Sequence, residues 1–227
     1  MLREDYILAW IRRYIQWIAE IAGLVKVEDY ISALRRVDLA LRSLLDLPPD
    51  SVTSLSEGEI LARLSLGDPE PSVQEKCAVL SALLKQLGQV CAANGRLEQS
   101  REAYLKALQI VLGLKLQGEP PALAPYVPSV EALLELLRGH PVPARTWGAL
   151  MIYFENARQF GRAEDALFAL LDASTDESEA IEVGLGFYRR LGVLSDEVLL
   201  AGDLPRDEVA AGLAELQARA HHAGAKT

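Results

Sequence analysis

Small and apolar residues recur every three or four positions along most of this chain, which is the spacing of one face of an α-helix. The clearest example is the segment 84–110, where this spacing is interrupted once, by the tight turn Asn94-Gly95-Arg96. The residues on the face are Leu84, Leu87, Gly88 and Cys91 before the turn and Ser100, Tyr104, Ala107 and Leu108 after it. The pattern predicts two amphipathic helices that pack together as a helical hairpin.

The same periodicity predicts helices along the rest of the chain. Predicted hairpins occupy about 5–45, 72–116 and 144–172, and further helices follow at about 177–220. Proline and glycine clusters at 67–71 and 118–121 interrupt the pattern, because proline cannot continue a helix. The alternating runs rich in Val, Ile and Thr that are typical of a sheet are missing. We therefore expect an all-α fold in a single helical domain over residues 1–227.

The first predicted helix, at about 3–24, has a very broad apolar face. Trp10, Tyr14 and Trp17 form an aromatic stripe along this face. The stripe has two interpretations: it packs in the core of one chain, or it forms the seam of a homodimer, since large apolar faces mark interfaces. These three residues are the candidate interface.

The three predicted hairpins resemble tetratricopeptide repeats (TPRs). In the hairpin at 72–116 the resemblance rests on Leu84, Leu87, Gly88, Cys91, Gly95, Ser100, Tyr104 and Ala107. In the last hairpin it rests on Trp147, Leu150, Phe154, Phe160, Ala163, Leu167 and Leu170, and in the first on Trp17, Ile21, Leu24, Tyr30, Ala33, Val37 and Ala40. Inserts of unequal length break the regular repeat. The resemblance implies TPR-like stacked hairpins in a compact, irregular α-array.

Nearly the whole chain also resembles an uncharacterised bacterial family that is known only as a domain of unknown function. Four segments are similar to that family: Arg3–Leu8, Glu28–Leu34, Gly161–Leu171 and Phe187–Val209. This resemblance agrees with the helical prediction and implies no activity.

In TPR arrays the first helix of each repeat lines a concave groove, and the resemblance therefore implies where a ligand would bind. Carried over by position, the candidate groove residues are Lys85, Gln89, Arg145, Ile152, Glu155 and Asn156. Lys85 and Arg145 are suited to a peptide carboxylate. The expected partner is an unknown protein or peptide.

Composition narrows the function classes. The chain has 227 residues and a formal charge of −9, which argues against nucleic acid and against anionic membranes as partners. Cys77 and Cys91 fall on one predicted helix, about 21 Å apart at 1.5 Å per residue, so they cannot form a disulfide with each other. Buried thiols, and a start at MLREDYILAW that is unlike a signal peptide, favour the cytoplasm.

Candidate chemistry does not point to an enzyme. His140 is isolated in a proline-rich turn, the cysteines form no paired motif, and acidic pairs fall near helix starts, where the helix dipole favours them. We therefore predict no catalytic, cofactor-binding or metal-binding residues, and no cofactor. The leading hypothesis is a non-enzymatic protein- or peptide-interaction module. The alternative is a structural or regulatory homo-oligomer that uses its aromatic N-terminal helix as the interface.

Overall fold

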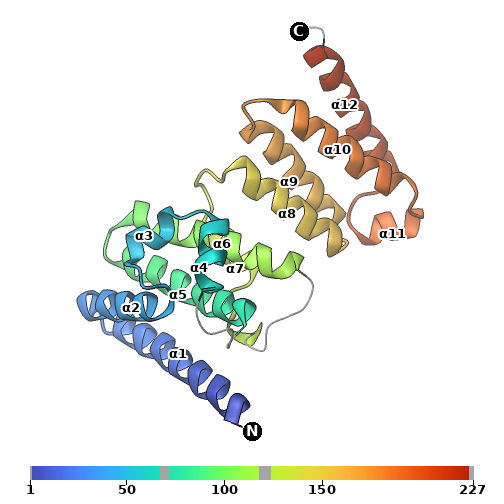
Figure 1. Ribbon diagram of the computed structural model, residues 1–227. Helices are drawn as coiled ribbons and strands as arrows, with labels where there is room; N and C mark the ends of the chain where they lie inside the picture. Colours follow the sequence, from blue (N-terminus) through green and yellow to red (C-terminus); the bar gives the residue numbers. More distant parts are fainter. Residues whose placement is uncertain (1, 67–71, 118–123, 225–227) are drawn as a thin grey trace. The chain divides into compact units, whose positions relative to one another are not determined.

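The computed structural model describes residues 2–66, 72–117 and 124–224 (Figure 1). Within these ranges the chain forms twelve α-helices, one short 3-10 helix and no strand, so the all-α prediction is confirmed. The predicted breaks at 67–71 and 118–121 lie outside the described residues. The first helices are α1 (Leu2–Lys26), α2 (Tyr30–Leu45), α3 (Pro49–Ser54), α4 (Glu57–Leu64), α5 (Val73–Ala93), α6 (Leu97–Leu116) and, after the 3-10 turn Ala124–Tyr126, α7 (Val130–Leu136). The remaining helices are α8 (Ala144–Asn156), α9 (Phe160–Ala173), α10 (Glu177–Gly192), α11 (Asp196–Ala201) and α12 (Arg206–Gly224).

The contacts within the chain divide it into two compact units, Met1–Pro141 and Val142–Thr227. The boundary falls in the proline-rich turn that contains His140, Pro141 and Pro143. Each unit is described by itself below. A single TPR-like domain over all 227 residues stays a prediction.

The first unit is built around the hairpin of α5 and α6. Residues on almost every side of α5 are buried, and Leu80, Leu83 and Leu84 are fully enclosed. The helix begins at a capping box, in which the Ser72 hydroxyl accepts a hydrogen bond from the Glu75 amide and the Glu75 carboxylate accepts one from the Ser72 amide. The hairpin of α1 and α2 packs against α5, and the short helix α4 also contacts it.

The second unit contains the hairpin of α8 and α9, followed by α10 and α12. Figure 1 shows α8, α9 and α10 as a row of adjacent helices within this unit. The core is formed by large side chains that are at most 3% exposed, among them Leu150, Phe154, Leu167, Phe187 and Tyr188. The small residue Gly184 lets α10 approach its neighbours, since a β-carbon there would lie 2.8 Å from Leu216 Cδ1 on α12.

One turn geometry joins the two helices of each predicted hairpin. At Gly95, between α5 and α6, the backbone is left-handed, its amide donates to the Ala92 carbonyl, and the next amide donates to the Cys91 carbonyl. This is a Schellman motif. The same pair of hydrogen bonds, with the same sequence offsets, surrounds the left-handed residues Glu28, Arg158 and Asp203. The turns α1–α2, α5–α6, α8–α9 and α11–α12 therefore share one geometry.

Candidate functional site

A groove in the second unit lies between α8 and α10, over the end of α9. It encloses a water-accessible volume of about 390 Å³. Its lining residues are Ala144, Arg145, Gly148 and Ile152 from α8, Leu170 and Ser174 from α9 and its C-cap, Asp176 from the N-cap of α10, and Glu179, Ala180 and Val183 from α10. We call this feature the α8–α10 groove.

The walls of the groove follow from helical spacing. Arg145, Gly148 and Ile152 are three and four residues apart, so they share one face of α8. Across the groove, Glu179 and Val183 have the same relationship on α10. Ile152 is 44% exposed and Val183 is 38% exposed, although both are large and apolar. The groove therefore offers an unfilled apolar surface to a ligand.

Beyond Ile152 and Val183, an ion pair ties α8 to α10. The Arg190 guanidinium donates to both carboxylate oxygens of Glu155, at 2.6 and 2.8 Å. The Glu155 side chain is only 16% exposed, and its bond raises the pKa of Arg190 above the ordinary value. Glu155, a predicted groove residue, is thus engaged in joining the two walls, and this end of the groove carries a neutralised charge pair.

The other end of the groove is polar and carries more negative than positive charge. Arg145 lies there together with Asp176 and Glu179. Asp176 caps α10. Its carboxylate accepts hydrogen bonds from the hydroxyl and the backbone amide of Ser178, and these bonds, the hydroxyl's above all, hold the pKa of the Asp176 carboxyl below its ordinary value. This carboxylate therefore stays ionised at neutral pH.

The sequence around this groove is strongly acidic. Between Arg162 and Arg189 the chain has no Lys, Arg or His, whereas it has the acidic residues Glu164, Asp165, Asp172, Asp176, Glu177, Glu179 and Glu182. These residues belong to α9, α10 and the turn between them. Arg145 is accordingly the one basic residue among those that line the groove.

The structure separates the predicted groove residues. Arg145 and Ile152 line the α8–α10 groove, and Asn156 is exposed at the last position of α8. Lys85 and Gln89 lie half-buried on α5 in the first unit and do not belong to this groove. The α10 wall was missed, because the sequence indicated which helices form hairpins and not how neighbouring hairpins stack. The one feature of the sequence that indicates this wall is the run of acidic residues before Val183.

The three candidate interface residues, Trp10, Tyr14 and Trp17, differ in how deeply they are buried. Tyr14 is 1% exposed and belongs to the core of the first unit. Its ring contacts Trp10 and Trp17, with centroid separations of 4.6 and 5.1 Å. Trp10 and Trp17 are half-buried, and the Arg36 guanidinium stacks over the Trp17 ring at 5.0 Å. Tyr14 is therefore covered within its own chain, and an interface role stays a prediction for Trp10 and Trp17.

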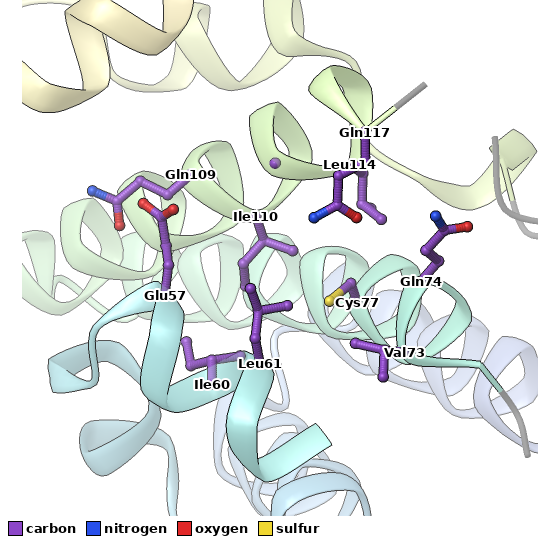
Figure 2. Close-up of a pocket in the computed structure, with 11 residues that line it drawn as sticks. Glu57, Ile60, Leu61, Val73, Gln74, Cys77, Gln109, Ile110, Leu114 and Gln117 are labelled. Carbon is purple, nitrogen blue, oxygen red and sulfur yellow. The ribbon is translucent and has the colours of Figure 1, made fainter. Parts of the chain in front are cut away.

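A smaller pocket in the first unit lies between α4, α5 and α6 (Figure 2). Its water-accessible volume is about 100 Å³, and the buried residues among those that line it are Ile60, Cys77, Ile110 and Leu114. Burial raises the pKa of the Cys77 thiol to about 11, so this group stays protonated at neutral pH and is a poor nucleophile. Cys77 and Cys91 are both buried free thiols, as expected from the sequence.

A hydrogen bond between a half-buried carboxyl group and a buried phenol lies where three helices of the second unit meet. The Tyr188 hydroxyl on α10 donates to Glu164 Oε1 on α9 at 2.6 Å. Burial raises the pKa of the Glu164 carboxyl above its ordinary value. The hydrogen bond from Tyr188 lowers this pKa and the carboxylates of Glu208 and Asp165 raise it, but the effect of burial is the largest. A β-carbon on Gly212 of α12 would lie 2.1 Å from the Tyr188 oxygen. Side chains of α9 and α10 and the backbone of α12 at Gly212 meet at this pair, so we interpret it as a packing contact between helices.

Metal binding and membrane insertion are two other roles to consider for the described residues. No group of three or more His, Cys, Asp or Glu side chains in these residues is placed to hold a metal ion. Among the described helices, none is both long enough and apolar enough to cross a membrane.

The fold and the groove define an all-α protein with a groove on the surface of its second unit. Comparison with known protein families matches residues 1–221 to the Family of unknown function (DUF6483). The chain belongs to this family. No curated protein and no solved structure matches the chain.

Proposed function

We propose that this protein is a non-enzymatic interaction module that binds a segment of a protein or a peptide in the α8–α10 groove. The observation that carries the proposal is the pair Ile152 and Val183, two exposed apolar side chains on opposite walls of one unfilled groove. Covering such a surface is favourable by roughly 25 cal/mol per Å² of apolar area. A ligand that contributes an apolar side chain gains this free energy.

The resemblance of the hairpins to TPRs supports the proposal. The three predicted hairpins share one turn geometry, centred on the left-handed residues Glu28, Gly95 and Arg158. In the second unit, α8 is the first helix of the hairpin α8–α9, and α10 is the next helix after that hairpin. In TPR arrays the first helices of successive hairpins line the ligand groove. Arg145 and Ile152 lie at the groove positions carried over from that family.

Gly148 supplies an energetic argument for the groove. Glycine inside a helix costs about 1 kcal/mol relative to alanine. A β-carbon at Gly148 would meet only Leu170 Cδ2, at an ordinary contact distance of 3.9 Å, so packing does not require glycine there. Its missing side chain instead widens the groove, at the expense of helix stability.

Selection from a random peptide library on the immobilised full-length chain tests the proposal. We expect enriched peptides whose binding is lost with Ile152→Asp, which places a charge on the apolar wall. Leu200→Asp is the matched control, because Leu200 is 69% exposed on α11 and does not line the groove. Circular dichroism verifies that both variants fold. Peptides that bind both variants equally well, or no enrichment at all, would contradict the proposal.

We also propose that the protein works in the cytoplasm. Cys77 and Cys91 are free thiols, and such thiols persist in a reducing compartment.

One observation favours the alternative function, a structural or regulatory homo-oligomer. Beside the aromatic stripe of α1, Leu8 is 47% exposed, and Ile11, Ile15 and Ile18 are half-buried at helical spacing. Sedimentation equilibrium of the wild-type chain and of Trp10→Glu tests this function. A dimer that the substitution dissociates without unfolding supports it, and a strict monomer excludes it.

A further inference from the structure

We propose that the ligand of the α8–α10 groove is a cationic segment with an aliphatic anchor: a Lys or Arg side chain at the polar end and a Leu or Ile side chain at the apolar end. This inference rests on the proposed function, because it names the chemistry of the partner for the same groove. It replaces the expectation that Arg145 recognises a peptide carboxylate.

The apolar end selects the anchor. Ile152 and Val183 form its walls, and Leu170 and Ala180 complete it. Beyond them the Arg190–Glu155 ion pair occupies both charged groups with each other, so this end offers no uncompensated charge to a polar ligand group. A charged side chain placed here would lose its hydration without a partner, whereas Leu or Ile would gain the free energy of apolar burial.

The polar end selects the positive charge. Two carboxylates, Asp176 and Glu179, line it with one guanidinium, that of Arg145. Glu177 and Glu182 are exposed on the same helix, and the whole stretch from 163 to 188 has no basic residue. The local field is therefore negative. Such a field raises the association rate of a cationic partner and opposes an acidic one.

The length of the groove sets the spacing between the two ligand residues. Arg145 and Ile152 are seven residues apart on α8, which is about 10 Å along the helix axis. A peptide in the polyproline II conformation has three residues per turn and advances about 3.1 Å per residue, so side chains three positions apart lie on one face, about 9 Å from each other. A basic residue and an aliphatic residue three positions apart, as in the order Lys-Ala-Ser-Leu or its reverse, therefore span the groove.

Two measurements on the full chain test the inference. In the first, fluorescence anisotropy compares labelled peptides that contain Lys-Ala-Ser-Leu, Glu-Ala-Ser-Leu or Lys-Ala-Ser-Ser, each in both orders, between identical Gly-Ser flanks. We expect the Lys-to-Glu and the Leu-to-Ser changes each to weaken binding by about tenfold or more. In the second, the peptides enriched from the random library are read for a basic residue three positions from an aliphatic one.

A matched pair of variants locates the charge effect. Glu179→Lys and Glu177→Lys make the same charge change in the same first turn of α10, and only Glu179 lines the groove. We expect Glu179→Lys to weaken the Lys-Ala-Ser-Leu peptide several-fold more than Glu177→Lys. Equal effects of the two variants would overturn the assignment of the basic residue to the groove.

The outcomes separate this inference from the function on which it rests. Peptides that require Ile152 but carry no basic residue, or that bind equally well with Glu in place of Lys, overturn the inference and leave the interaction module intact. If no peptide in either experiment depends on Ile152, the proposed function itself is wrong.

Discussion

A β-carbon added to Gly88 on α5 would lie 2.3 Å from Cε1 of Tyr104 on α6. The tyrosine ring occupies the space that a side chain at position 88 would need. Tyr104 is 5% exposed and the neighbouring Ala107 is fully buried, so the ring has little room to move away. Gly88 and Tyr104 therefore fix how closely the two helices of the central hairpin approach each other.

Gly88→Ala should destabilise the protein by about 1–3 kcal/mol, because the new methyl group overpacks this contact. Gly113→Ala on the partner helix α6 is the matched control, since a β-carbon there meets nothing within 4 Å. That change should stabilise by up to about 1 kcal/mol, as alanine is the better helix former. Thermal melting measures both, and changes of the same sign in the two variants would refute the packing assigned to Gly88.

In the left-handed turn between α1 and α2, introducing a glycine should stabilise the protein, whereas removing the glycine at position 88 should destabilise it. Glu28 has φ of 59°, a conformation that costs an L-residue with a side chain roughly 1–2 kcal/mol and costs glycine almost nothing. Glu28→Gly should therefore raise the free energy of unfolding, by about 1 kcal/mol, in urea denaturation.

The same substitution inside a helix provides the control. Glu102 is exposed in the middle of α6, where Glu102→Gly should lower the free energy of unfolding by about 1 kcal/mol. A loss of stability in both variants would show that the Glu28 turn does not hold the left-handed geometry.

Local pattern was enough to predict the hairpins. The periodicity around Leu84 and the glycine at position 95 mark two helices and the turn between them, and the observed α5 and α6 begin and end within a residue or two of that prediction. The equivalent turns at Glu28 and Arg158 carry no glycine, so the shared geometry is visible only in the backbone.

The groove could be predicted only in part. Arg145 and Ile152 could be predicted as groove residues because they lie on the first helix of a hairpin. Val183 faces Ile152, and Arg190 bonds Glu155, across more than 30 positions of sequence and from a helix outside that hairpin. Such contacts depend on how hairpins stack, which single-helix periodicity does not encode. For the same reason the periodicity of α1 did not distinguish core from interface, and Tyr14 is a core residue.

Glu164 makes the stability of the second unit depend on pH. Burial raises the pKa of this carboxyl in the folded state above the ordinary value of 4.5, so its protonated form favours folding. That contribution is fully present below the unfolded pKa and is lost as pH rises through the folded pKa. Glu164→Gln, which is neutral and still accepts the hydrogen bond from Tyr188, should therefore be more stable than the wild type at neutral pH.

The advantage of Glu164→Gln should shrink as the pH falls below the ordinary carboxyl range. Chemical denaturation at several pH values measures it. Glu182→Gln removes the same charge from an exposed position on α10 and controls for the overall charge of −9. A stability difference between Glu164→Gln and the wild type that does not change with pH would contradict the raised carboxyl pKa assigned to Glu164.

If the α8–α10 groove binds a peptide segment, as we propose, methyl NMR of the full chain should detect it during a titration with the Lys-Ala-Ser-Leu peptide. The methyl resonances of Ile152 and Val183 should shift saturably, while those of Val79, buried on α5 in the first unit, should stay in place. Unmoved Ile152 and Val183 resonances, both with this peptide and with every peptide enriched from the library, would show that the groove does not bind a peptide.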